Sequence, residues 1–148
     1  MSKNKKPKTK VNPSSAKRPK IASSPNSFYN MNPSWRISRL EMLGFYGWHK
    51  LDTKTLLHVK DKLASFETMT WAEILVSSKK FNHSVNVNDL CSIAQARLSE
   101  IGQDDIDELV SLRLSGKERV WGILDLGVLT LLWWDPEHEV CPSILKNT

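Results

Sequence analysis

The most regular pattern of apolar and polar positions lies between residues 109 and 134. Apolar side chains occupy every second position in 109–114, and the alternation continues in 119–124. Side chains spaced by two residues lie on one face of a β-strand. The run 128–134 is almost wholly apolar, which is typical of a central strand buried on both faces. These patterns predict three consecutive strands.

Tight turns are predicted between these strands. Their sequences are Ser115-Gly116-Lys117 and Asp125-Leu126-Gly127. Glycine reaches positive φ without a steric penalty, as short hairpin turns require. Because connections this short join antiparallel neighbours, the three strands are predicted to form an antiparallel meander.

Helical spacing marks two segments before the meander. Asp52 is a suitable N-cap for a helix at 53–66, in which apolar residues recur every three or four positions. Thr70 and Glu73 have the spacing of a capping box, in which each side chain satisfies a backbone N–H near the other residue. They predict a second helix that ends near Lys79.

A third helix is predicted to be capped by Asn88 and to run through Ile101. Gly102 follows at the position where a left-handed residue commonly ends a helix. Residues 81–86, between the second and third helices, are predicted to be a loop.

A further strand is predicted at 35–41, with Trp35 and Ile37 on one face. The resulting order is one strand, three helices and three strands. It predicts a single α+β domain at 35–148, with about three helices packed on one face of a small, mostly antiparallel, four-stranded sheet. Residues 1–34 are predicted to be a disordered basic tail and linker.

The tail holds much of the positive charge. Within 1–22 there is no acidic residue, and the basic ones are Lys3, Lys5, Lys6, Lys8, Lys10, Lys17, Arg18 and Lys20. Since these eight charges exceed the formal net charge of +5, the remaining residues carry −3. So charged a segment cannot bury enough apolar surface to fold alone. It can hold phosphate groups in a salt-dependent way, or act only as a solubilising leader.

Several classes of protein are disfavoured by the sequence. No uncharged apolar run is long enough for a membrane span, and none follows the early lysines as in a secretory signal. Cys91 and Cys141 lie outside any C-x-x-C pair, which favours free thiols in a reducing compartment. We therefore expect a cytoplasmic protein that needs no cofactor or bound metal.

The basic hairpin carries a resemblance to a known family. Its pattern is Leu112-Arg113-x-Ser115-Gly116-x-x-Arg119-Val120, followed by a turn and an apolar strand. This resembles the sheet of the RelE/ParE toxin superfamily. The resemblance covers about residues 105–140 by motif and the helical part by topology only, and this chain has an extra helix. It implies a RelE-like fold and a protein that acts on RNA as a ribosome-dependent mRNA endonuclease, or another toxin of that fold, neutralised by an antitoxin.

The resemblance also implies roles for particular residues. Arg113 and Arg119 match positions at which basic sheet residues of the nuclease branch hold the scissile phosphate. Two departures from the family pattern are Leu109 and Ser111, where those nucleases often have lysines. A third is the acidic segment 135–138 in place of a basic one.

Metal-independent RNA cleavage needs an acid and a base as well as positive charge. His138 is suited to proton transfer near neutral pH, and Glu137 or Asp135 is placed in sequence to orient it. The catalytic candidates are Arg113, Arg119, Glu137 and His138. The candidates for binding nucleic acid are Lys117, the base-stacking Trp121 or Trp134, and the tail residues Lys5, Lys6, Lys8, Lys10, Lys17, Arg18 and Lys20.

Structural alternatives exist for each candidate. His138 is also consistent with an exposed loop, and the two arginines with ion pairs to Glu108 and Glu118. The adjacent Trp133 and Trp134 must face opposite sides of a strand, so at least one belongs to a core. A metal site built from residues 135–141 matches no established zinc spacing. The alternative function is a non-catalytic module that binds a protein through its sheet edge or exposed aromatic side chains, with the tail adding affinity for nucleic acid.

Overall fold

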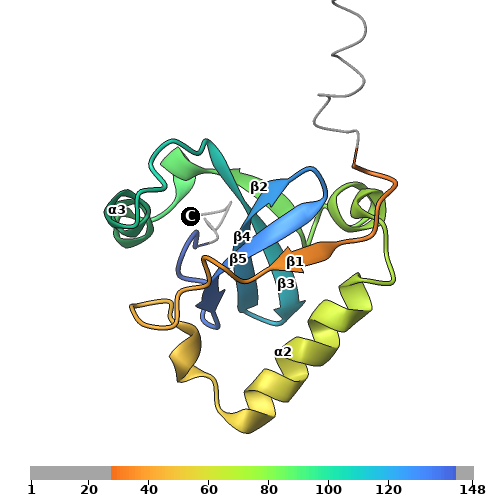
Figure 1. The fold of residues 1–148 in the computed structure, drawn as a ribbon, viewed down its shortest axis with the longest axis horizontal. Coiled ribbons are helices and arrows are strands. Elements are labelled where there is room, and N and C mark those ends of the chain that lie inside the picture. The colour runs from red at the N-terminus through yellow and green to blue at the C-terminus, as the bar shows by residue number, and fades with distance from the viewer. Residues whose placement is uncertain (1–27, 143–148) are drawn as a thin grey trace, which may run out of the picture.

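The computed structural model describes residues 28–142, which form an α+β fold around a five-stranded mixed sheet (Figure 1). The strand order is β1-β5-β4-β3-β2, in which β1 is parallel to β5 and the other neighbours are antiparallel. The strands are β1 (Ser34–Arg36), β2 (His83–Asn86), β3 (Glu108–Ser115), β4 (Glu118–Asp125) and β5 (Val128–Asp135). The predicted antiparallel meander of three strands is confirmed. The predicted sheet had four strands, whereas the structure has a fifth, β2, at its edge. Most of the predicted tail, at 1–27, lies outside the described residues.

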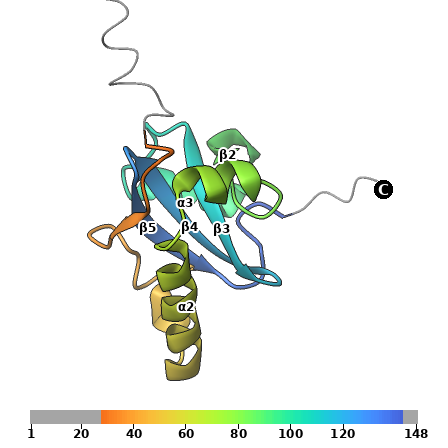
Figure 2. The same cartoon turned by 90° about the vertical axis from the view of Figure 1, so that its right-hand side faces the viewer.

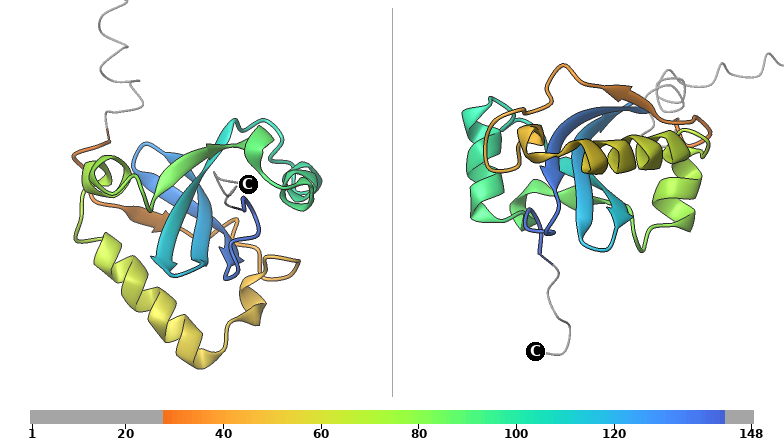
Figure 3. Two further views of the ribbon diagram at one scale, coloured as in Figure 1. Left: turned by 180° about the vertical axis from the view of Figure 1, so that it is seen from behind. Right: turned by 90° about the horizontal axis from the view of Figure 1, so that it is seen from below.

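The helical elements occupy both sides of the sheet, α2 on one and α3 on the other (Figures 1 and 3). They are α2 (Thr53–Phe66), α3 (Ser92–Glu100), the π-helical turn η2 (Glu73–Ser77) and the 3-10 turns η1 (Trp48–Lys50) and η3 (Val87–Asp89). The prediction that all helices pack on one face was therefore wrong. The apolar stripe of each helix predicts that one side of the helix is buried, but it does not predict which face of the sheet covers that side.

The predicted helix boundaries are confirmed where a capping side chain marks them. Asp52 accepts a hydrogen bond from the Thr55 backbone N–H at 2.7 Å, at the start of α2. The Glu73 N–H donates to the Thr70 hydroxyl at 3.2 Å, as a capping box requires. Gly102 follows α3 with φ of 72° and donates to the carbonyl of Ser99.

Two boundaries and one loop differ from the prediction. The helix expected to begin after Asn88 begins at Ser92, and Asn88 lies in η3. Residues 83–86, predicted to be loop, form the edge strand β2, in which only Val85 is buried. Pairing with β3 stabilises this polar strand, and such distant pairing leaves no local pattern. The first strand covers only Ser34–Arg36 and leaves Ile37 exposed.

A β-bulge in β5 divides its apolar residues between two cores. Trp121 pairs with Trp133 and Gly122 with Leu131, so Leu132 is the additional residue. Leu132 and Trp133 both belong to the cluster beside α3, whereas Leu131 and Trp134 belong to the cluster beside α2. The prediction that Trp133 and Trp134 face opposite sides is therefore confirmed, and both are buried.

Gly122 is required by the close approach of β4 and β5 at this bulge. A Cβ atom there would lie 2.5 Å from the carbonyl oxygen of Thr130 and 2.9 Å from Cγ of Leu129. Neither atom is the far end of a flexible side chain, so any larger residue would push the two strands apart.

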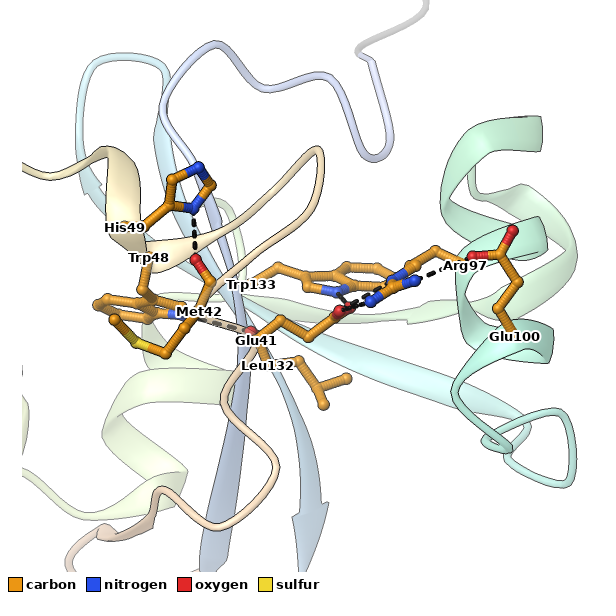
Figure 4. Close-up of polar contacts among 8 residues, drawn as sticks. All are labelled: Glu41, Met42, Trp48, His49, Arg97, Glu100, Leu132 and Trp133. Carbon is orange, nitrogen blue, oxygen red and sulfur yellow. Dashed lines mark hydrogen bonds and ion pairs between the residues drawn. The ribbon is translucent and has the colours of Figure 1, made fainter.

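Glu41 ties the loop before η1 to the sheet and to α3 (Figure 4). Its side chain is only 9% exposed and accepts hydrogen bonds from Nε1 of Trp133 at 2.5 Å and Nε of Arg97 at 2.8 Å. Its backbone N–H donates to the carbonyl of Leu132 at 3.0 Å, and Nε1 of Trp48 donates to the same carbonyl at 3.2 Å. The loop therefore satisfies backbone groups that the bulge removes from ordinary strand pairing.

We predict that Glu41→Gln lowers the free energy of unfolding by about 1–3 kcal/mol, because it weakens three charge-assisted hydrogen bonds, from Trp133 and from two nitrogens of Arg97, in a nearly buried position. Asp61→Asn is the matched control, since Asp61 pairs with Lys60 while both side chains are more than 70% exposed. The control should change stability by less than about 0.5 kcal/mol in denaturant titrations. Equal effects of the two substitutions would contradict a stabilising role for Glu41.

Candidate anion-binding site

Arg113 and Arg119 lie directly opposite each other at the turn end of the β3–β4 hairpin. Both side chains are half-buried, on the face of the sheet that also carries Trp121. Partial burial, and then the positive charge of Arg113, lower the pKa of Arg119 from its ordinary value. Two desolvated cations side by side repel each other, and a bound anion would relieve that repulsion.

The backbone carbonyls of the hairpin turn orient Arg119. Its Nη1 atom donates to the carbonyl of Gly116 at 2.7 Å and to that of Glu118 at 3.1 Å. Within 28–142 no ion pair joins Arg113 or Arg119 to a carboxylate, although Glu108 and Glu118 were alternatives from the sequence. The arginine pair therefore has no direct ion-pair partner in this range, although the nearby carboxylate of Asp135 partly offsets the charge of Arg119.

Asp135 places His138 next to the arginine pair. It ends β5 opposite Arg119, is 1% exposed, and accepts a hydrogen bond from Nε1 of Trp121 at 3.1 Å. It also accepts from the backbone N–H groups of Glu139 at 2.8 Å and Val140 at 3.0 Å. These bonds turn the chain back over the sheet after β5 (Figure 2). His138 stands in this turn with φ of 57°.

A hollow of about 330 Å³ brings His138 and Arg119 together with His83 of β2. The other lining residues are Lys80, Phe81, Cys141 and Pro142, so the described residues that line it include no carboxylate. Arg113 adjoins the hollow, because its guanidinium lies over the ring of Phe81, 5.0 Å from the centroid. Arg119 and His138, predicted separately from the sequence, thus line the same hollow, and Arg113 lies beside it.

The electrostatics of the hollow favour the neutral form of His138 by lowering its pKa. Burial is the largest cause of its lowered pKa, followed by the positive charge of Arg119. His83 and Arg113 lower it further, whereas Asp135 acts in the opposite direction. A neutral imidazole beside two guanidinium groups can accept a proton from a bound ligand.

The remaining sequence candidates lie apart from the hollow. Glu137 is exposed and its carboxylate lies 3.8 Å from Nζ of Lys117, which is also exposed. Neither residue is among those that line the hollow. Trp121 and Trp134 are 1% and 3% exposed, so neither ring is available to stack on a base in this structure. The basic residues of 1–22 lie outside the described part.

His83, Lys80 and Phe81 were missed by the sequence analysis, which placed them in or next to a loop. Asn82 holds this segment in place, because its side chain accepts a hydrogen bond from the Arg113 backbone N–H at 2.9 Å. His83 pairs with Ser111 across β2 and β3. The only sequence signal was the composition Lys-Lys-Phe-Asn-His at 79–83, which identifies no partner.

A second polar cluster joins α2 to the same hairpin but lacks the geometry of a catalytic relay. Nε2 of His58 lies 3.0 Å from Oε1 of Glu118 and 3.4 Å from the Ser115 hydroxyl. In a Ser-His-acid relay the hydroxyl and the carboxylate bond opposite ring nitrogens. Here both meet the same nitrogen, so the cluster anchors α2 to the β3–β4 turn.

The described residues offer neither a metal-binding cluster nor a helix that could span a membrane. Residues 28–142 contain no cluster of three or more His, Cys, Asp or Glu side chains placed to hold a metal ion. Within the same range, every helix is too short or too polar to cross a bilayer. No protein-family model, curated protein or solved structure matches this chain.

We predict that Arg119→Gln raises the pKa of His138, because it removes the largest source of electrostatic repulsion of the imidazolium. The ring signals of His138 in an NMR pH titration measure this directly. Lys117→Gln is the matched control: it removes a positive charge from the same hairpin, outside the hollow, and should leave the titration of His138 in place. If the pKa of His138 is unchanged by Arg119→Gln, the two side chains do not interact electrostatically.

Proposed function

We propose that this chain is a RelE-like, toxin-type protein that binds the phosphodiester backbone of RNA in the hollow and cleaves it without a metal. The observation that supports this proposal is that Arg119 and His138 line one hollow, which Arg113 adjoins, and that no carboxylate is among the described residues lining it. The resemblance of the hairpin to the RelE/ParE superfamily points in the same direction.

The arginine pair suits a phosphodiester for two reasons. Guanidinium groups form charge-assisted hydrogen bonds with phosphate oxygens in fixed geometry. The pair is also partly desolvated before binding, so a transition state with added negative charge on phosphorus would be stabilised by groups already in place. Lys80 and the exposed Lys117 would extend the positive surface along the bound RNA strand.

The two histidines of the hollow supply the proton transfers of RNA cleavage. Neutral His138 accepts the proton of the 2′-hydroxyl, whose oxygen then forms a bond to phosphorus. The bond between phosphorus and the 5′-oxygen breaks, and His83, as the general acid, donates a proton to that leaving oxygen. The products are a 2′,3′-cyclic phosphate and a 5′-hydroxyl, and neither water nor metal is consumed.

The cellular role in this proposal is a toxin controlled by a protein antitoxin. Binding to the ribosome would present mRNA as an unpaired strand, and the basic residues of 1–22 would add salt-dependent affinity for ribosomal RNA. An antitoxin would act by covering the hollow.

We predict that Arg113→Ala and Arg119→Ala each weaken binding of a single-stranded RNA oligonucleotide by about tenfold and reduce the salt dependence of binding by about one phosphate contact. Fluorescence anisotropy measures both, with an oligonucleotide methylated at every 2′-oxygen to prevent cleavage. His83→Ala and His138→Ala should bind normally yet fail to cleave unmodified RNA. In cells, induction should arrest translation, and Arg119→Ala or His138→Ala should relieve the arrest.

Lys60→Ala, on the exposed surface of α2, is the control for a general loss of positive charge. Binding that falls equally in Lys60→Ala and Arg119→Ala would remove the hollow from RNA recognition. Cleavage, with or without ribosomes, that survives both histidine substitutions would refute the proton-transfer roles.

A non-catalytic interaction module is the second candidate function. It is favoured by apolar side chains that stand in solvent around the 42–45 loop: Met42, Leu43 and Phe45 are 55%, 72% and 51% exposed, and Ile93 of α3 is 50% exposed. Phe45 and Ile93 line a largely apolar hollow of about 340 Å³. Exposed apolar groups gathered in this way commonly mark a protein-binding surface.

If this second function holds, Leu43→Ser combined with Phe45→Ser should abolish co-purification of a partner while the melting temperature stays within about 3 °C. Leu57→Ser is the matched control, because Leu57 is 60% exposed on α2. The control should retain the partner. Equal partner recovery from the double variant and the parent chain would exclude this surface.

A further inference from the structure

The two cysteines, 50 positions apart in sequence, meet where α3 begins. Cys91 is the residue immediately before α3, and its backbone N–H donates to the carbonyl of Val140 at 2.8 Å. Cys141 follows Val140 directly. Standard bond lengths added to that hydrogen bond place the two Cα atoms at most about 7 Å apart, and about 6 Å at ordinary angles. Disulfides usually join Cα atoms separated by about 4.4–6.8 Å.

The thiol of Cys141 lies beside the segment that leads into Cys91. Sγ of Cys141 donates to the carbonyl of Asp89, two residues before Cys91, at 3.4 Å. Sγ of Cys91 lies 3.2 Å from the Tyr46 hydroxyl. Both thiols are half-buried and pack against the cluster beside α3. Burial chiefly raises the pKa of the Cys141 thiol, and the charges of Asp89 and Cys91 raise it further.

We propose that Cys91 and Cys141 form a redox-active dithiol whose co-reactant is a low-molecular-weight disulfide such as oxidised glutathione. One protein thiolate attacks a sulfur of the oxidant, forming a mixed disulfide and releasing one glutathione thiolate. The second protein thiolate then attacks the protein sulfur of the mixed disulfide and releases the other glutathione. The protein loses two electrons and two protons, and one oxidised glutathione becomes two reduced ones.

The bond would fasten the segment after β5 to the start of α3. Cys141 lines the hollow and lies three residues after His138, so the bond fixes one wall of that hollow. Since a thiolate is the attacking species, the raised pKa of Cys141 makes the exchange slow at neutral pH and faster as the pH rises. This inference does not depend on RNA being the ligand.

The test uses the full chain in glutathione buffers of graded redox ratio, followed by alkylation and intact mass analysis. The folded chain should lose two hydrogens and resist alkylation, at a ratio of oxidised to reduced glutathione at least tenfold below that required in denaturant. Cys91→Ser and Cys141→Ser are the matched controls, and each should stop at a single glutathione adduct. The oxidised chain should melt roughly 5–10 °C above the reduced one.

Accumulation of a doubly glutathionylated folded chain would overturn the proposal, because it would mean that the thiols react separately. So would the same required ratio in folded and denatured chains, which would mean that the fold does not bring the sulfurs together. A disulfide between two copies of the chain, visible as a doubled mass, would likewise refute an intramolecular pair.

Discussion

The geometry of the candidate site depends on one buried carboxylate. Asp135 ends β5 and accepts three hydrogen bonds, from the indole of Trp121 and from two backbone N–H groups of the following turn. A carboxylate so far removed from water is stable only when its oxygens are satisfied. The requirement couples three features. It fixes a core tryptophan, it folds the chain back after β5, and it sets a negative charge beneath the cationic hollow. His138 occupies its position because this turn does.

One face of the β3–β4 hairpin is buried in the core, and the other carries the arginine pair of the candidate site. On the face toward α2, Leu112 and Val120 are fully buried in the larger core. On the opposite face the next residues along, Arg113 and Arg119, reach the end of the core formed with α3. Because side chains alternate along a strand, a single hairpin supplies both a rigid apolar support and a pair of closely spaced cations. The buried apolar face holds the two strands together despite the repulsion between the two arginines.

Local chemistry in the sequence was sufficient to predict the meander, the helix at 53–66 and the capping residues Asp52, Thr70 and Gly102. Each of these depends on neighbours within a few positions. The strand β2, the parallel pairing of β1 and the placement of helices on both faces depend on distant contacts instead. For the same reason the cations of the hairpin were identified but His83 was not. It enters the hollow through the pairing of β2 with β3, and its own segment is polar and irregular in pattern.

The burial of Trp121 and Trp134 also depends on contacts with residues distant in the sequence. The sequence analysis named both as candidates for stacking on a base, yet large aromatic side chains on central strands are needed to fill the two cores. The hollow is instead bordered by Phe81, which is 45% exposed and already lies under Arg113. Recognition of a planar ligand at this site would therefore fall to Phe81.

The positive φ of His138 has a consequence for the evolution of stability at this position. A left-handed backbone disfavours any residue with a Cβ atom by about 1–2 kcal/mol, and glycine is the residue that avoids this strain. Selection for thermal robustness alone would drive position 138 toward glycine. The same substitution, His138→Gly, would therefore give a small gain in stability and remove the imidazole from the site.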